Sequence, residues 1–216
     1  MNYRKTLSAS TAHPAPLLDA LAGYIYLIHT LKFRPENITI TGESAGGHLI
    51  LLLTRYLVHV DLPIPTTLAL SSPWADFTSR EGGYNWKSHE ENYETDYIPY
   101  LSKLSWSSGM RWYTMEARRS LWFSPVLARG GDWDYLKNNG KNGSADEKPN
   151  GGNEGNARIR VYIMYGNKEI LADEILALYE GMKQAGVDVF LRKVSDVLLF
   201  LLPTSLVLSG RRTTSV

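Results

Sequence analysis

The 216-residue sequence contains no cysteine, which excludes disulfides, thiolate nucleophiles and thiolate metal ligands. It also lacks a charge excess, because 23 Lys and Arg against 22 Asp and Glu give a formal net charge of +1. This balance does not favour nucleic acid or an anionic membrane as a partner. The spacing of His, Asp and Glu does not match a metal site, so we expect neither a metal nor another cofactor.

A long hydrophobic run is missing as well. The most apolar stretch, VLLFLLPTSLVL at residues 197–208, includes Pro203 and is shorter than the roughly 20 residues of a membrane-spanning helix. We expect it to form a buried strand or helix, or an exposed apolar tail, and we do not expect a membrane anchor. Residues 1–16 lack the apolar core of a signal peptide. The compartment and the oligomeric state stay open.

Short β-branched runs alternate along the chain with segments of helical periodicity. The predicted strands are residues 38–41, 66–72, 158–166 and 187–194, and the predicted helices are residues 17–33, 46–58 and 173–185. This alternation predicts a single α/β domain over residues 1–216, with a mostly parallel sheet and helices on both faces.

Two regions interrupt the alternation. Residues 79–135 are rich in Trp and Tyr, and we expect them to form short helices and loops of a lid-like insertion. Residues 137–157 are rich in Gly and Asn and nearly free of apolar side chains. Such a segment buries too little surface to offset the entropy lost on ordering, so we expect a disordered surface loop.

The most informative motif is Gly42-Glu43-Ser44-Ala45-Gly46, which matches the pattern G-x-S-x-G between a predicted strand and a predicted helix. This context is typical of a sharp turn that raises a nucleophilic serine above the sheet. Side chains at 42 and 46 would collide with the neighbouring strand or helix, so both positions favour glycine. The Ala45 N–H would lie at the helix start, where it could bind an oxyanion.

Two plainer interpretations accompany this motif. The pentapeptide could be a tight turn with an incidental exposed serine. His48 follows on the same helix, and we expect it to be a packing or pocket-wall residue rather than the base that activates Ser44.

Several segments around this motif resemble one known family. NYR…AHPAPLLDALAGYIYLI resembles the family's DYR…EHPFPAALEDALAAYRYLL, ENITITGESAGGHL resembles SRIVVAGDSAGGNL, and LSSPWADFT resembles LISPWLDLT. These segments, in this order, resemble the α/β-hydrolase fold-3 group of hormone-sensitive-lipase-like esterases, with fungal steryl acetyl hydrolase-like members closest. The resemblance implies an α/β-hydrolase fold and a serine carboxylesterase or lipase-like activity on small to medium apolar esters, acetylated sterols among them.

The same resemblance implies roles for residues near the C-terminal part of the chain. GNKEILADEILALYEGMKQAGVDVFL, residues 166–191, resembles the segment that carries the catalytic acid, and Glu169 takes the acid's position. Asp173 is the competing acid, although we expect it to begin or cap the following helix. Asn167 stands where related chains often carry Asp. Trp74 would line an acyl or alcohol pocket together with the aromatic segment.

Two family features are absent from the sequence. The family's His-Gly-Gly oxyanion motif would precede the serine by about 70 residues, and its histidine base would follow the last strand, but the last histidine here is His89. We therefore expect a chain that is truncated at its N-terminus, incomplete on that side of the sheet, and divergent after about Val194, with residues 195–216 as a divergent tail.

Loss of the base lowers the rate of a serine hydrolase by roughly 10⁴- to 10⁶-fold. One hypothesis is therefore an impaired esterase, in which His13 or His89 could still substitute for the base. The other is a non-catalytic pseudo-hydrolase or fragment that at most binds apolar ligands.

Overall fold

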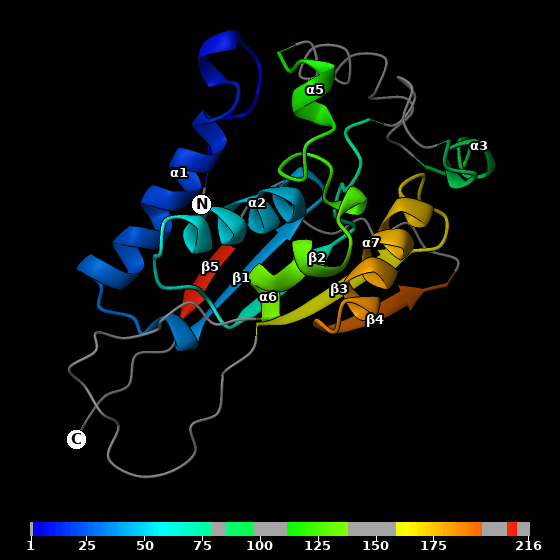
Figure 1. Cartoon of the computed structure of the whole chain (residues 1–216). Helices are drawn as coiled ribbons and strands as arrows, with labels where there is room; N and C mark the ends of the chain where they lie inside the picture. The colour runs from blue at the N-terminus through cyan, green and yellow to red at the C-terminus, as the bar shows by residue number, and fades with distance from the viewer. Residues whose placement is uncertain (1, 79–84, 97–111, 138–158, 196–206, 211–216) are drawn as a thin grey trace.

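The computed structural model describes residues 2–78, 85–96, 112–137, 159–195 and 207–210 (Figure 1). The strands in these residues form one sheet in the order β4-β3-β2-β1-β5. The first four strands pair in parallel and β5 is antiparallel to β1, so the sheet is mostly parallel, as predicted. The strands are β1 (Ile38–Glu43), β2 (Thr67–Ser71), β3 (Arg160–Gly166), β4 (Asp188–Val194) and β5 (Val207–Gly210).

Three longer helices among the described residues accompany the sheet. They are α1 (Ala15–Ile25), α2 (Ala45–His59) and α7 (Ala172–Gln184). A π-helical turn, η2 (Tyr26–Thr30), continues α1, so this predicted helix is shorter and less regular than its periodicity suggested. The remaining short helices are η1 (Ala9–Thr11), η3 (Pro35–Asn37), α3 (Ser88–Glu91), α5 (Met115–Arg118), η4 (Pro125–Leu127), η5 (Gly130–Trp133) and α6 (Asp134–Lys137).

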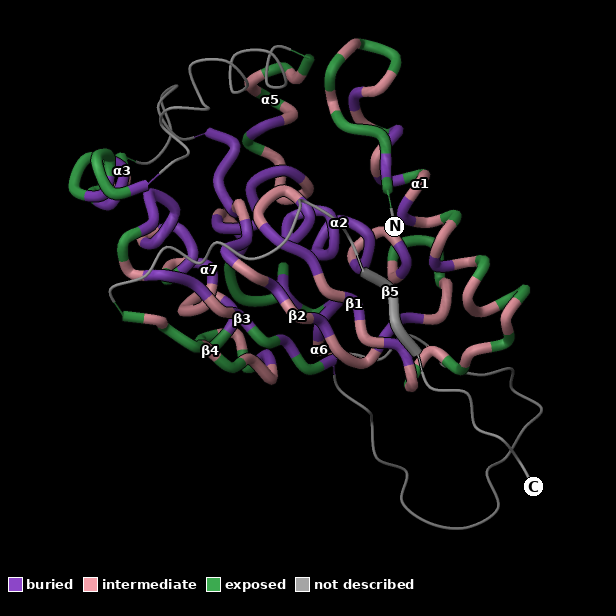
Figure 2. The backbone as a smooth tube through the Cα atoms, turned by 180° about the vertical axis from the view of Figure 1, so that it is seen from behind, coloured by how far each residue is buried: buried purple, intermediate pink, exposed green. Residues whose placement is uncertain are grey.

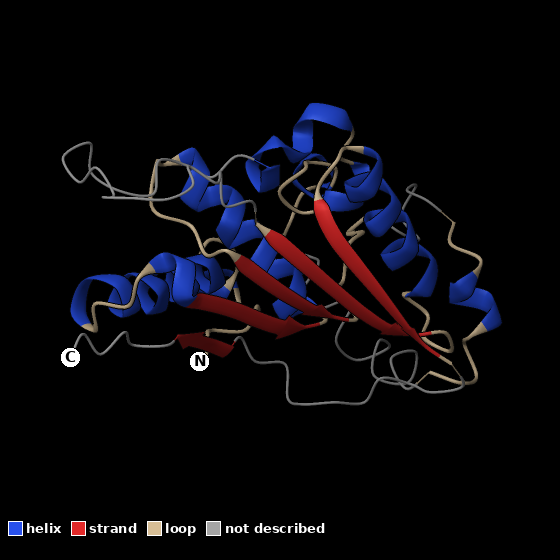
Figure 3. Cartoon of the chain, turned by 90° about the horizontal axis from the view of Figure 1, so that it is seen from below, coloured by secondary structure: helices blue, strands red, loops and turns tan. Residues whose placement is uncertain are grey.

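One face of the sheet carries the core. Ile40, Leu68 and Val161 lie in register across the three central strands and are fully buried. Helices α2, α6 and α7 cover this face (Figures 1 and 3). Full burial of each such aliphatic side chain stabilises the fold by about 1.5–3 kcal/mol.

The opposite face differs from the prediction of helices on both faces. Seen from behind, the strands are not covered by any described helix (Figure 2). Tyr162 and Phe190, which are neighbours in register on this face, are 42% and 50% exposed, and their rings stack with centroids 5.2 Å apart. In the described residues, therefore, the helices cover one face of the sheet only.

Helix α2 is the central helix of the covered face. Every residue from Gly46 to Thr54 is buried, because α2 packs against β1, α1 and α6. A helix that is apolar on nearly all sides is typical of the centre of a core. This environment fixes the first turn of α2, where Ser44 precedes the helix.

The other regional predictions are only partly covered by the structure. Short helices and loops do occur in the described parts of residues 79–135, as expected, whereas 79–84 and 97–111 lie outside the described residues. The predicted disordered loop also lies almost wholly outside them. Of the apolar run at 197–208, only the last two residues are described, and they belong to β5. None of the described helices is long and apolar enough to cross a membrane.

Candidate active site

The bend predicted from the G-x-S-x-G motif is present at Ser44. This residue lies between β1 and α2 with φ of 51° and ψ of −117°, a conformation that non-glycine residues rarely adopt. Its N–H donates to the Ser71 carbonyl at 2.9 Å, and its carbonyl accepts from the N–H groups of His48 and Trp74, both at 3.1 Å. Such backbone strain costs about 1–3 kcal/mol and persists only where surrounding contacts fix it.

Close contacts explain why Gly42 and Gly47, on either side of Ser44, carry no side chain. A Cβ on Gly42 would lie 2.7 Å from the carbonyl carbon and oxygen of Gly46, a distance that real Cβ atoms essentially never show. The strand and the helix therefore approach each other too closely for a side chain at 42. The motif did not single out Gly47, where a Cβ would lie 2.9 Å from Cβ of Pro73.

Ala45 is the first residue of the 15-residue helix α2. Backbone N–H groups in the first turn of a helix have no partner within the helix, and the helix dipole makes this end partly positive. The Ala45 N–H thus lies directly after the serine, where an anionic oxygen would be stabilised.

His48 is a packing residue in this structure, as the spacing suggested. Its Nε2 lies 3.1 Å from the Trp122 carbonyl oxygen, and its ring lies 4.5 Å from that of Phe77. Burial lowers the pKa of His48 to about 4. The imidazole is therefore neutral near pH 7, and its bonded nitrogen is directed to Trp122.

The other histidines have different surroundings. His13 is partly buried with its ring 5.0 Å from Phe123, and burial lowers its pKa. His89 is 3% exposed, and its Nε2 lies 3.5 Å from Oε2 of Glu174. Among the residues that the structure describes, which include all five histidines, none forms a hydrogen bond with the Ser44 hydroxyl.

Trp74 belongs to an aromatic cluster next to the serine turn. Its ring stacks on Phe77 with centroids 4.0 Å apart, and Phe77 in turn contacts His48. The N–H groups of Trp74 and His48 bond to the same Ser44 carbonyl, so the cluster begins directly beside the turn. Its role as a substrate pocket stays a prediction.

Glu169 lies in the loop between β3 and α7, at the edge where the parallel strands end. Its side chain is 5% exposed, and its Oε1 accepts from the Ser72 hydroxyl at 2.9 Å and from the Gly166 N–H at 3.0 Å. Ser72 directly follows β2, whose last residue binds the Ser44 N–H. The serine turn and the Glu169 carboxylate are therefore linked through the end of β2.

A second carboxyl group adjoins Glu169. Glu43, the residue before the serine, is 9% exposed, and its Oε2 has no hydrogen-bond partner in the described part of the chain. Burial, together with the negative charge of Glu169, raises the pKa of Glu43 to about 7. Two neighbouring carboxyl groups in a poorly solvated place favour a state in which one of them keeps its proton.

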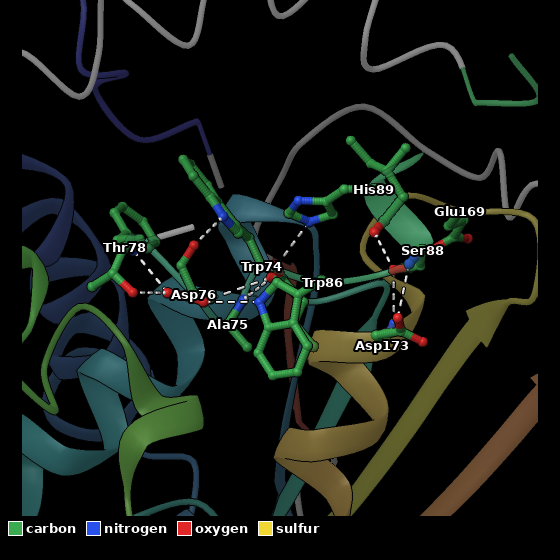
Figure 4. Close-up of polar contacts among 12 residues, drawn as sticks. Trp74, Ala75, Asp76, Thr78, Trp86, Ser88, His89, Glu169 and Asp173 are labelled. Atoms are coloured by element: carbon green, nitrogen blue, oxygen red, sulfur yellow. Dashed lines mark hydrogen bonds and ion pairs between the residues drawn. The ribbon is translucent and has the colours of Figure 1, made fainter. Parts of the chain in front are cut away.

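Asp173 lies at the beginning of α7, as one of the two expected alternatives had it, but the N-cap residue is Leu171. It is the second residue of α7, and its Oδ2 accepts from the Ser88 N–H at 2.8 Å (Figure 4). The N–H of Asn167 donates to Val194 and thus extends the pairing of β3 with β4. Asp173 faces the α3 region, whereas Glu169 faces the end of β2.

Glu174 is a buried carboxylate that sequence reasoning missed. It is fully buried, and its Oε1 accepts from the N–H groups of Ala75 and Asp76 at 2.8 and 3.2 Å. Burial raises its pKa, and the nearby His89 opposes this shift. Figure 4 shows Trp86 next to Asp76, and Trp86 Nε1 donates to Asp76 Oδ2 at 2.8 Å. Nothing in the local sequence distinguishes Glu174 from a solvated helix residue.

No three His, Cys, Asp or Glu form a group that could hold a metal, as far as the described residues go. This edge of the sheet offers three chemical groups: the hydroxyl of a serine on a strained turn, the N-terminus of a helix, and a pair of buried carboxyl groups.

A family model described as alpha/beta hydrolase fold matches residues 1–141. The chain belongs to this family, and both the family and the fold class predicted from its motifs are confirmed.

Two relatives of known name are a lipase and an acetyl-hydrolase. A triacylglycerol lipase of Mycobacterium tuberculosis is 36% identical over 60 residues, which cover 28% of this chain and 14% of the lipase. An acetyl-hydrolase of Streptomyces hygroscopicus is 28% identical over 91 residues, which cover 42% of this chain and 29% of that protein.

Solved structures give the same result. A hormone-sensitive lipase from a metagenome library superimposes with a TM-score of 0.66 at 25% identity, over 91% of this chain and 56% of that one. The hormone-sensitive-lipase homologue EstE7, also from a metagenome library, gives 0.66 at 26% identity with the same coverage. The chain thus spans little more than half the length of these structures. It is an esterase- or lipase-like α/β hydrolase by family.

Proposed function

We propose that the site is a serine carboxylester hydrolase site for small to medium apolar esters, in which Ser44 is the nucleophile. The observation that carries this proposal is the backbone of Ser44, strained at φ of 51° between a buried strand and a buried helix. A tight turn with an incidental serine would not require this strain. Relatives named as lipase and acetyl-hydrolase support an ester as the substrate class.

In the proposed reaction, the Ser44 oxygen attacks the ester carbonyl and its proton passes to a base. The Ala45 N–H stabilises the oxyanion that forms on the carbonyl oxygen, and the alcohol leaves with a proton. Water then hydrolyses the acyl-enzyme. Glu169 would orient and stabilise the protonated base, because its carboxylate is already held by Ser72 and Gly166.

The weak point of this reaction is the base. His48 bonds to the Trp122 carbonyl and His89 lies next to Glu174. In the described residues, no histidine is hydrogen-bonded to Ser44. A serine without an aligned imidazole loses roughly 10⁴- to 10⁶-fold in rate. We therefore propose slow turnover. The same placement of the histidines favours a second candidate function, binding of an apolar ligand without catalysis.

Hydrolysis of p-nitrophenyl acetate by the chain and by Ser44→Ala tests the proposal. We expect a slow rate that Ser44→Ala abolishes, and covalent labelling of Ser44 by a fluorophosphonate. Equal rates and no labelling would refute the nucleophile assignment and leave the binding function. Added imidazole supplies a base from solution, so it should raise the rate of the wild type more than that of Ser44→Ala.

Histidine variants locate any base that the chain itself provides. If His13→Ala or His89→Ala abolished a Ser44-dependent rate, that histidine would be the base, and the proposal of an impaired site would be wrong.

A further inference from the structure

The loop that carries Glu169 is held by side chains from a segment far away in the sequence. We name residues 167–171, between β3 and α7, the acid loop. Figure 1 places α3 beside this loop. The contacting side chains come from α3 and the turns that follow it, and they are Ser88, Asn92, Thr95 and Asp96.

Two of these side chains hold the peptide unit directly after Glu169. Asn92 Nδ2 donates to the Glu169 carbonyl at 2.7 Å and to the Asn167 carbonyl at 3.2 Å. Asp96 Oδ2 accepts from the Ile170 N–H at 2.7 Å. The carbonyl of 169 and the N–H of 170 belong to one peptide group, so this group is fixed at both ends.

Both side chains are suited to this task, because Asn92 is 8% exposed and Asp96 is 7% exposed. Water competes little for such hydrogen bonds, and a bond to a charged group such as Asp96 is among the stronger ones. The remaining contacts lie farther from Glu169. Thr95 donates to the Lys168 carbonyl at 3.1 Å, and Ser88 donates to the Ile170 carbonyl at 2.7 Å.

We propose that Asn92 and Asp96 are positioning residues for Glu169. This inference rests on the proposed function, in which Glu169 is the acid. Ser72 and Gly166 hold the carboxylate, while Asn92 and Asp96 hold the backbone from which the side chain extends. Rotation of the 169–170 peptide would move the carboxylate away from the end of β2. A displacement of about 1 Å in a catalytic group can lower the rate about 100-fold.

The test uses variants that change one contact each. Asn92→Leu removes both donors at nearly constant size, and Asp96→Leu removes the acceptor. Asp96→Asn keeps an acceptor but removes the charge. Thr95→Val is the matched control, because it removes one hydrogen bond to the acid loop but none to the 169–170 peptide. The two readouts are amide hydrogen exchange of the acid loop and Ser44-dependent hydrolysis of p-nitrophenyl acetate.

We expect exchange in the acid loop to rise at least tenfold in Asn92→Leu and Asp96→Leu, while exchange in β1 and α2 stays as in the wild type. The kcat should fall about tenfold with KM nearly unchanged. Asp96→Asn should regain most of both properties, and Thr95→Val should stay within about twofold of the wild type. Unchanged exchange, or equal losses in all four variants, would overturn the proposal.

A double variant tests whether Asn92 acts through Glu169. In the background Glu169→Gln, the change Asn92→Leu should cost no further rate, because the acid is already disabled. A further tenfold loss would mean that Asn92 acts by another route and would overturn the proposal. If the wild type shows no Ser44-dependent rate at all, the proposed function fails. The exchange measurements then decide by themselves whether Asn92 and Asp96 hold the acid loop.

Discussion

The serine turn and the acid loop lie at the same edge of the sheet but are built differently. The turn is formed by residues 42–47, which are contiguous in the sequence, and its shape follows from strain at Ser44 and the absence of side chains at Gly42 and Gly47. The acid loop is held by hydrogen bonds from residues 88–96 and from Ser72. Steric contact within one segment fixes the first, and polar side chains from distant segments fix the second.

The largest effect should come from adding a methyl group to the serine turn. Gly42→Ala would place Cβ 2.7 Å from the backbone of Gly46, which cannot move without shifting α2 in the core. We expect the free energy of unfolding to fall by about 4 kcal/mol. Urea denaturation followed by circular dichroism measures this change.

Gly181→Ala is the control for Gly42→Ala. Gly181 lies inside α7, where a Cβ would meet Trp133 Nε1 and the Ala128 carbonyl at ordinary distances of 3.6 and 3.7 Å. Alanine favours the helix over glycine by about 0.5–1 kcal/mol, so this variant should be neutral or more stable. If both variants lost equal stability, close contact at Gly42 would not be the cause.

The difference between the two regions explains what the sequence could predict. The serine turn needs only a β-branched run, two glycines and a serine in order, and all of these are local. The acid loop needs Asn92 and Asp96 to meet residues 167–170, about 75 positions away. No periodicity or spacing in the sequence predicts contacts between these two segments. Asn92, Asp96 and Glu174 were therefore missed, although Glu169 itself was proposed from a resemblance.

The prediction of helices on both faces was wrong for the described residues for a different reason. Strand residues such as Thr41, Tyr162 and Phe190 alternate with core residues. Their residue types alone do not predict whether a helix covers this face of the sheet. Alternation of strands and helices predicts a parallel sheet, but the face on which each helix packs depends on the order of the strands.

Loss of the buried acceptor Glu174 in α7 should have the next largest effect. Glu174→Leu would leave the N–H groups of Ala75 and Asp76 without this acceptor and would remove the contact between Glu174 and His89. We expect a loss of about 3 kcal/mol. Glu174→Gln keeps an acceptor oxygen and should lose less than half as much. Thermal unfolding of the two variants separates loss of the acceptor from loss of the charge.

A pH dependence distinguishes the carboxyl pair from an ordinary surface acid. Burial and the negative charge of Glu169 raise the pKa of Glu43 from its ordinary value of 4.5 to about 7 in the folded state, so the folded state binds this proton more tightly than the unfolded state. The resulting stabilisation is complete below pH 4.5 and is lost as the pH rises through 7. Glu43→Gln cannot ionise, so it should be more stable than the wild type by about 2 kcal/mol at pH 8 and nearly equal to it at pH 4.

Chemical denaturation at several pH values measures this difference. Glu90→Gln, the same substitution at an exposed position of α3, is the control for the chemical change itself. A constant difference between Glu43→Gln and the wild type from pH 4 to pH 8 would contradict the raised pKa of Glu43 beside Glu169.

The smallest effect concerns Ser72, which combines a strained backbone, as in the serine turn, with a side-chain hydrogen bond to the acid loop. Ser72 has a φ of 42°, and its hydroxyl donates to Glu169. Both Ser72→Ala and Ser72→Gly lose that hydrogen bond, but only glycine relieves the positive φ. Ser72→Gly should therefore be more stable than Ser72→Ala by about 1 kcal/mol, the reverse of the usual order of these residues. At Gly181 in α7 the usual order should hold, so urea denaturation of the two pairs isolates the strain. If alanine were the more stable residue at both positions, the backbone at the end of β2 would carry no measurable strain, and the hydroxyl contact to the acid would be the whole contribution of Ser72.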